Sequence, residues 1–191
     1  MQSHQNPPAS GTAPDARGRE LAPSAWVLRF APLIAPAGAV LDVAAGAGRH
    51  ARWFHASGHA VVAIDRDTMP LADLAGRPRV EIVTADLESG TPWPLAGRRF
   101  AAVVVTNYLH RPLRPILGEA GAPRGLLIYE TFAAGNEMFG KPSNPDFLLR
   151  PGELLEAVRG RLRVLAYEDL EVSEPRPAMV QRLCARAEPS R

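Results

Sequence analysis

The chain of 191 residues is 46% hydrophobic and 22% charged, a composition that is typical of globular proteins and excludes a fibrous or wholly disordered one. Its length suits one domain with a sizeable core. The formal net charge is only +2, and the arginines are spread along the chain rather than gathered in a block, so nucleic acid is not indicated as a partner.

Apolar runs and cysteine content indicate the compartment. No run of about 18 apolar residues is present, and the first residues lack the apolar centre of a signal peptide, so we predict no membrane segment. The single cysteine, Cys184, excludes an internal disulfide and is expected to be a small buried hydrophobe in a late strand. We therefore expect a cytoplasmic protein.

The N-terminal part divides into a tail and a short helix. Residues 1–20 are rich in Pro, Ser, Gly and Ala and predict a flexible tail, followed by a single domain over residues 21–188. Residues 23–34 carry apolar side chains at roughly helical spacing, which predicts a lead-in helix that Pro32 bends or ends. These side chains are Trp26, Phe30, Leu33 and Ile34.

The rest of the chain alternates short aliphatic runs with amphipathic stretches. The runs predict strands at residues 40–44, 61–64, 80–84, 100–106, 126–132, 162–172 and 179–186. Helices are expected at residues 50–57, 69–74, 113–120 and 152–158. Strands that lack strict polar alternation and are separated by helices indicate a parallel sheet covered on both faces. The link between the last two runs is too short for a crossover helix, so the last strand is expected to be antiparallel. The prediction is an α/β protein with a Rossmann-like, doubly wound, seven-stranded sheet.

One segment has no clear period. Residues 133–150, AAGNEMFGKPSNPDFLLR, form the longest such stretch, and long loops in compact domains are usually functional. Its aromatic and Asn content favours an ordered lid.

A glycine turn follows the first strand in VLDVAAGAGRH. Ligands of open parallel sheets bind outside the carboxyl ends of the strands, where Gly46 and Gly48 stand. The absent Cβ atoms permit a ligand to approach the backbone, and the next helix begins with unpaired N–H donors. The turn therefore predicts a ligand with an anionic group.

The turn alone leaves two kinds of ligand open. Gly46, Gly48 and Ala51 satisfy the dinucleotide pattern, and Asp65 follows at the end of the second strand as a ribose ligand would. Asp42, however, lies inside the first strand, where a dinucleotide site normally has an apolar residue, and its carboxylate needs a donor such as an ammonium. Asp86 adds a third carboxylate at the same edge.

The motif order resembles that of the class I S-adenosylmethionine-dependent methyltransferases, among them compact bacterial enzymes of the tellurite-resistance kind. The resemblance rests on VLDVAAGAGRH, VVAIDRD, TADLES, FAAVVVTNYLHRPL and GLLIYETF, and covers roughly residues 26–187. It implies S-adenosyl-L-methionine as cofactor, with Asp42 near the ammonium, Asp65 on the ribose hydroxyls and Asp86 on the adenine amino group. Ala44 stands where the family most often has glycine. The full set implied to bind cofactor is Asp42, Ala44, Gly46, Gly48, Asp65, Arg66, Asp86, Leu87, Thr106 and Asn107.

The residues that act on the acceptor are less clearly indicated. His110 and Tyr129 are the candidate catalytic residues, because each follows or ends a central strand and His titrates near working pH. A histidine that merely packs under its loop is the alternative. The candidate acceptor ligands are Tyr108, Glu130, Asn136 and Arg150. The spacing of His50, His55 and His59 does not match a zinc motif, so no metal is expected.

The sequence thus predicts transfer of a methyl group to an unidentified acceptor by in-line displacement. A chain with no separate recognition domain suits a small molecule. The alternatives are a nicotinamide-dependent oxidoreductase and a cofactor-binding regulator or scaffold without catalysis.

Overall fold

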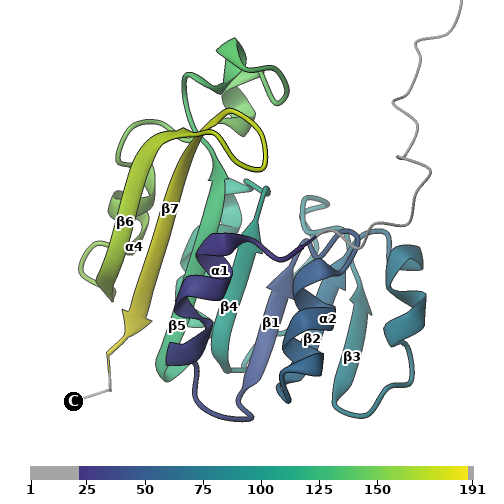
Figure 1. The fold of residues 1–191 in the computed structure, drawn as a ribbon. Helices are drawn as coiled ribbons and strands as arrows, with labels where there is room; N and C mark the ends of the chain where they lie inside the picture. The colour runs from purple at the N-terminus through teal and green to yellow at the C-terminus, as the bar shows by residue number, and fades with distance from the viewer. Residues whose placement is uncertain (1–21, 189–191) are drawn as a thin grey trace, which may run out of the picture.

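The computed structural model describes residues 22–188, in which seven strands form one sheet (Figure 1). The strands are β1 (Ala39–Val43), β2 (Ala60–Asp65), β3 (Val80–Thr84), β4 (Phe100–Thr106), β5 (Gly121–Phe132), β6 (Leu162–Val172) and β7 (Ala178–Ala187). Their order across the sheet is β3-β2-β1-β4-β5-β7-β6. The first five pair in parallel, and β7 is antiparallel to both of its neighbours. The predicted sheet and its reversed last strand are confirmed, whereas the predicted tail at residues 1–20 lies outside the described residues.

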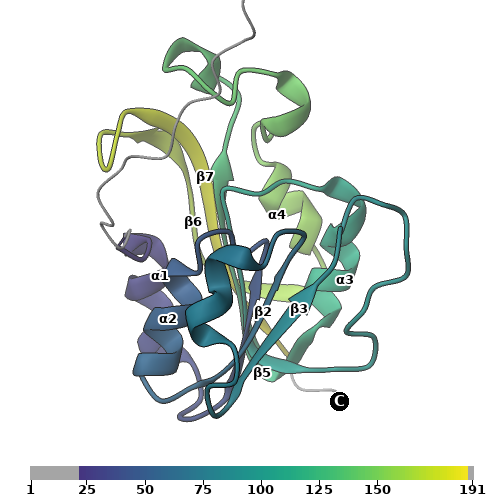
Figure 2. The ribbon, with the colours of Figure 1, turned by 90° about the vertical axis from the view of Figure 1, so that its right-hand side faces the viewer.

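The helices are short and cover both faces of the sheet (Figure 2). The α-helices are α1 (Ala25–Phe30), α2 (Arg49–Ala56), α3 (Arg114–Glu119) and α4 (Glu153–Val158). The 3₁₀ turns are η1 (Ala31–Leu33), η2 (Met69–Leu74), η3 (Arg111–Leu113), η4 (Asn136–Met138) and η5 (Pro145–Phe147). Helices α1 and α2 lie on one face of the sheet, and α3 and α4 lie on the other. The helix expected at residues 69–74 is a 3₁₀ turn, whose second residue is proline.

The lead-in helix ends where Pro32 was expected to end it. Helix α1 stops at Phe30 and continues as the turn η1, which holds Pro32 near its start. Because the helical period changes at that point, Leu33 turns to solvent and is 50% exposed, contrary to its predicted place on the apolar face. Val27, which the prediction did not include, is fully buried instead.

Successive side chains of each strand enter two separate apolar layers. Leu41 and Val43 pack with α3 and α4, whereas Val40 packs with α1 and α2. Cys184 of β7 lies in the second layer, fully buried as predicted, and burial raises its thiol pKa to about 12. The sheet is therefore covered on both faces, and its carboxyl edge is the open one.

The long segment after β5 is an ordered loop whose two ends meet. Ala134 donates its N–H to the carbonyl of Leu149 at 2.9 Å, and Leu149 donates to Phe132 at 3.0 Å. Between these residues the chain forms η4 and η5 and rises above the carboxyl edge of the sheet (Figure 1). The predicted order of this segment is confirmed.

Candidate functional site

Three residues with positive φ form the turn after β1. Their φ angles are 52° at Ala44, 54° at Gly46 and 75° at Gly48. A Cβ atom on Gly48, the N-cap of α2, would lie 2.4 Å from Cδ2 of Leu71, so both conformation and packing require glycine there. A Cβ atom on Gly46 would meet no atom within 4 Å, which leaves open space beside the turn.

Asp65 ties this turn to the end of β2. One carboxylate oxygen accepts the N–H of Gly46 at 2.8 Å, and the other accepts the N–H of Asp67 at 2.9 Å. A carboxylate has about four lone-pair directions, so two remain for a ligand.

Asp42 lies beneath the turn and is only 1% exposed. Its carboxylate accepts the N–H of Ala51 at 3.1 Å and thereby holds the first turn of α2. Burial raises the pKa of Asp42 to about 7, although the Ala51 hydrogen bond and the Arg49 charge oppose that rise. A cation bound nearby would stabilise the ionised form.

A cavity of about 410 Å³, named the cofactor cavity after the predicted cofactor ligands that line it, opens at the ends of β1, β2, β3 and β4. It is lined by Ala44, Asp65, Arg66, Ala85, Asp86, Leu87, Glu88, Tyr108 and Phe147. Five of these residues were predicted to bind cofactor, and Asp65 and Asp86 share the cavity despite their distance in sequence. Ala85, Glu88 and Phe147 were missed; Phe147 could have been found from the aromatic content of the predicted lid.

Tyr108 was expected to contact the acceptor but lines the cofactor cavity. Its hydroxyl is buried near the Glu88 carboxylate and meets no partner among residues 22–188 at normal hydrogen-bond geometry. Burial and the nearby Glu88 charge raise the pKa of Tyr108 above its usual value, so the phenol is neutral and can donate. A buried donor of this kind fits a polar ligand.

A second cavity of about 410 Å³, named the acceptor cavity after the predicted acceptor ligand Glu130 that lines it, lies between the N-terminus of α1 and the hairpin of β6 and β7. Its polar residues include Ser24, Arg49, Asn107, Glu130, Arg176 and Arg182, and its apolar ones include Pro23, Phe132 and Val180. Consecutive residues Asn107 and Tyr108 line different cavities, so the chain after β4 runs between the two.

Ser24 connects three elements at the acceptor cavity. Its hydroxyl donates to Oε1 of Glu130 at 2.8 Å, and its N–H donates to Nε2 of His50 at 3.1 Å. Burial lowers the pKa of His50 to about 3, so the ring is neutral and accepts. Arg182 lies 3.5 Å from the other oxygen of Glu130, which fixes that carboxylate at the cavity.

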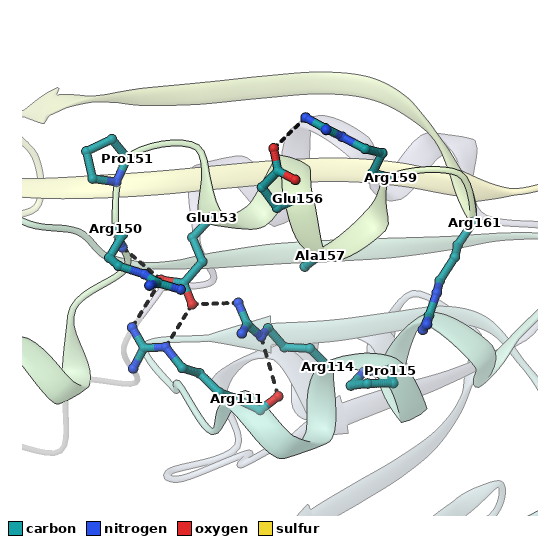
Figure 3. Close-up of a pocket in the computed structure, with 10 residues that line it drawn as sticks. All are labelled: Arg111, Arg114, Pro115, Arg150, Pro151, Glu153, Glu156, Ala157, Arg159 and Arg161. Carbon is teal, nitrogen blue, oxygen red and sulfur yellow. Dashed lines mark hydrogen bonds and ion pairs between the residues drawn. The ribbon is translucent and has the colours of Figure 1, made fainter.

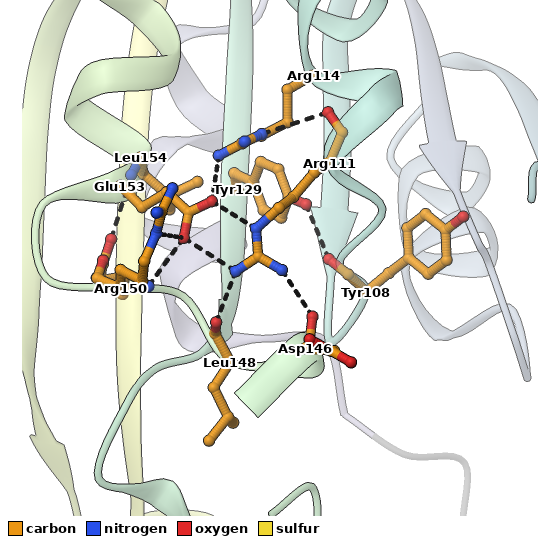
Figure 4. A network of polar contacts seen from close by, with 10 residues as sticks. Tyr108, Arg111, Arg114, Tyr129, Asp146, Leu148, Arg150, Glu153 and Leu154 are labelled. Carbon is orange, nitrogen blue, oxygen red and sulfur yellow. Dashed lines mark hydrogen bonds and ion pairs between the residues drawn. The ribbon is translucent and has the colours of Figure 1, made fainter. Parts of the chain in front are cut away.

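Several predicted residues lie away from both cavities. Tyr129 is 2% exposed and donates its hydroxyl to the carbonyl of Tyr108 at 2.9 Å (Figure 4), so it is not placed to act as a base. Asn136 is buried and donates to the carbonyl of Pro142 at 2.8 Å within the loop. Arg150 lines a different groove. The half-buried His110 lines neither cavity.

Five predicted cofactor ligands do not line the cofactor cavity, namely Asp42, Gly46, Gly48, Thr106 and Asn107. The first three support the turn and α2, as described above. Thr106 ends β4 opposite Glu130 in the register. Asn107, also predicted to bind cofactor, lines the acceptor cavity with φ 54° and donates its N–H to the carbonyl of Glu130.

A third cavity, of about 700 Å³, lies between α3 and α4 (Figure 3). Five arginines and two glutamates line it, together with Pro115, Pro151 and Ala157. Most of the arginines are paired: Arg111 and Arg114 bind Glu153, and Arg159 binds Glu156.

Residues 22–188 contain neither a metal-binding cluster nor a membrane-spanning helix. No group of three His, Cys, Asp or Glu side chains in this range is arranged to hold a metal ion. No helix in the range has the length and apolar character to cross a membrane.

Residues 40–120 match the family model described as a methyltransferase domain. No curated protein matches the chain. TehB from Haemophilus influenzae has a similar structure, with 16% identity and a TM-score of 0.68; the match covers 85% of this chain and 61% of TehB. The chain therefore spans about three fifths of the length of that neighbour.

Two further solved structures are similar. Burkholderia thailandensis 1,6-didemethyltoxoflavin-N1-methyltransferase, solved with 1,6-didemethyltoxoflavin and S-adenosylhomocysteine, is 22% identical, with a TM-score of 0.60 and coverage of 85% of this chain and 76% of that one. The [4+2]-cyclase SpnF is 17% identical, with a TM-score of 0.63 and coverage of 86% and 80%. At these identities the similarity shows the fold.

Proposed function

We propose that this chain is a class I S-adenosylmethionine-dependent methyltransferase, and that its single domain, residues 21–188, transfers a methyl group to a small molecule. The observation that carries the proposal is the cofactor cavity. It brings Asp65 and Asp86 together beside the glycine turn, within the residues that match the methyltransferase model.

The lining of the cofactor cavity fits an adenosyl group. Its volume of about 410 Å³ is in the range of small-ligand sites. Asp65 would accept from the two ribose hydroxyls, and Asp86 from the adenine amino group, with Leu87 beside the ring. The unpaired hydroxyl of Tyr108 offers a further donor. Asp42 would ionise more readily near the ammonium of the methionine part.

When bound, the cofactor supplies an electrophilic methyl group on a sulfonium and leaves as a neutral thioether. The task of this chain is therefore to orient the acceptor and exclude water, and a base is needed only when the acceptor is protonated. Glu130, held by Ser24 and Arg182, is the carboxylate best placed in the acceptor cavity to take a hydrogen bond from the acceptor.

The size and lining of the acceptor cavity favour a small acceptor. The lining of this cavity of about 410 Å³ includes the apolar side chains of Phe132 and Val180 as well as the charged side chains of Arg49 and Arg176. The toxoflavin enzyme was solved with a small acceptor and S-adenosylhomocysteine together, which supports this class. We also propose a cytoplasmic location, which the single buried cysteine favours.

A second candidate function is a reaction or a regulatory role without methyl transfer. This candidate is supported by the structural similarity to SpnF, which is named as a [4+2]-cyclase rather than a methyltransferase. Turnover separates the two: release of S-adenosylhomocysteine with a panel of small acceptors supports methyl transfer, and cofactor binding without turnover supports the second candidate.

Cofactor binding is tested by calorimetric titration with S-adenosylhomocysteine. We expect Asp65→Ala to weaken binding by at least about tenfold, because two charge-assisted hydrogen bonds are lost. The matched control is Asp67→Ala, since Asp67 lies two residues further on and lines neither cavity. That variant should bind within about twofold of the wild type. A wild-type protein that binds no S-adenosylhomocysteine would contradict the proposal.

A further inference from the structure

Arg111 joins the long loop to the body of the protein. Its Nη1 donates to the carbonyl of Asp146 at 2.7 Å, and its Nη2 donates to the carbonyl of Leu148 at 2.9 Å (Figure 4). These two carbonyls belong to the residues on either side of Phe147. One guanidinium therefore fixes the backbone on both sides of a single aromatic residue.

Phe147 is the loop residue that lines the cofactor cavity, together with Asp86 and Leu87. The turn that contains Phe147 is held by hydrogen bonds within the turn itself. The carbonyl of Asn144 accepts the N–H of Phe147 at 3.0 Å, and its Oδ1 accepts the N–H of Asp146 at 3.0 Å. Phe147 is 52% exposed, so packing alone holds its ring weakly. The position of the ring then depends on what holds the backbone of its turn.

Glu153 is the anchor for Arg111. The side chain is 4% exposed, and its carboxylate accepts Nε of Arg111 at 2.7 Å and Nη2 at 3.0 Å. It also accepts from Arg114 at 2.6 Å and from the N–H of Arg150 at 2.8 Å (Figure 3). Burial alone would raise the pKa of Glu153, but these hydrogen bonds and charges outweigh it and lower the pKa to about 2. The carboxylate is therefore charged at neutral pH and orients the guanidinium.

We infer that Arg111 is a positioning residue for the cofactor: it sets Phe147 as the aromatic wall of the cavity, where the adenine ring would stack. The inference rests on the proposed function. The planar guanidinium group of Arg111 is suited to this task, because it can donate to the carboxylate of Glu153 and to two backbone carbonyls at the same time. Arg111 and Arg114, which line the cavity between α3 and α4, are both paired with Glu153. Their presence there is therefore explained without a ligand bound in that cavity.

The test is a double-mutant cycle on the affinity for S-adenosylhomocysteine, measured by calorimetry. Arg111→Ala and Phe147→Ala should each weaken binding by about tenfold, the size of a lost base–aromatic stack. The double variant should be no weaker than the weaker single variant, because both changes remove the same contact. A purely structural role of Arg111 would instead weaken binding further in the Phe147→Ala background.

Arg114→Ala is the matched control. Arg114 binds the same Glu153 but makes no described contact with residues 146–148. This variant should keep its affinity within about twofold. Thermal unfolding of each variant identifies any that fail to fold. Should Arg111→Ala not fold, Arg111→Lys replaces it, and about fivefold weaker binding is expected because an ammonium cannot make the same fork.

Wild-type affinity in Arg111→Ala or Arg111→Lys, or additive losses in the double variant, would overturn the inference. A wild-type protein that fails to bind S-adenosylhomocysteine would overturn the proposed function instead, so the two failures are distinguishable.

Discussion

The cofactor and acceptor cavities have equal volumes but are built in different ways. The cofactor cavity takes all its residues except Phe147 from residues 44–108, a segment in which each strand ends in its own motif. The acceptor cavity combines residues 22–25, Arg49 at the start of α2, Asn107 after β4, and segments from β5 to β7. A site made of successive strand ends can be recognised from sequence, whereas a site made of distant segments depends on their packing.

Gly48→Ala is expected to have the largest effect on stability, because it should distort the glycine turn beside the cofactor cavity. The new Cβ would lie 2.4 Å from the buried Leu71 in a left-handed conformation, so overpacking adds to backbone strain. We expect a loss of about 2–4 kcal/mol in the free energy of unfolding, measured with urea.

Gly58→Ala is the control for Gly48→Ala. Its φ is also positive, at 87°, but its Cβ would meet no atom within 4 Å. It should cost only about 1 kcal/mol. Equal losses in the two variants would show that packing against Leu71 contributes nothing.

Asp42→Asn is expected to have a smaller, pH-dependent effect. The folded-state pKa of Asp42 is raised to about 7 from 3.8, so the folded protein binds more protons than the unfolded chain between these values. Wild-type stability from this group therefore falls as pH rises from about 4 to about 7. The asparagine variant lacks that fall and can still accept from Ala51, so it should gain about 2 kcal/mol over the wild type at pH 8.

The difference between the Asp42→Asn and wild-type free energies of unfolding should shrink by pH 5. Urea unfolding at pH 5 and pH 8 measures it, and the opposing titration of His50 cancels because both proteins contain it. A difference that is the same at both pH values would contradict the assigned burial effect.

Glu130→Gln is expected to have the smallest effect. It should distinguish the role of the acceptor cavity in turnover from the role of the cofactor cavity in binding. It should lower kcat/KM for an identified acceptor by about tenfold, or about 1.4 kcal/mol, because a charged acceptor of hydrogen bonds is lost. The affinity for S-adenosylhomocysteine should stay within about twofold, since Glu130 does not line the cofactor cavity.

Glu168→Gln is matched to Glu130→Gln, because Glu168 lies 3.4 Å from the same Arg182 but lines neither cavity. It should leave kcat/KM near the wild-type value. A loss of S-adenosylhomocysteine binding in Glu130→Gln would show that the two cavities are one functional unit.

The apolar runs were sufficient to predict seven strands in their order of appearance, and the short link between the last two runs was sufficient to predict the reversed last strand. The start of β5 was missed, because its first residues, Gly121–Gly125, are not an aliphatic run. The prediction was weaker for helices, because a 3₁₀ turn that contains Pro32 follows helix α1 and the helix expected at residues 69–74 is a 3₁₀ turn that contains Pro70. The same limit explains Leu33, whose side chain leaves the apolar face when the helical period changes.

The carboxylates and the glycine turn could be predicted to share one edge, because parallel strands place their carboxyl ends together. Which of the side chains at this edge faces a cavity and which is buried in the core could not be predicted. Tyr129 and Glu130 are adjacent in β5, and only the register with β4 and β7 sends the first into the core and the second to a cavity. Arg111 lies within the quoted stretch FAAVVVTNYLHRPL, but its role could not be predicted from it, because the partners Asp146, Leu148 and Glu153 are brought to it by the fold.

Cys184 has a practical consequence for experiments on this protein. It is the sole thiol of the chain, and its complete burial shields it from maleimide dyes in the native state. A fluorophore attached to a cysteine introduced on an exposed loop would therefore label one chosen position. The protein is in this sense ready for single-site labelling without prior removal of its native thiol.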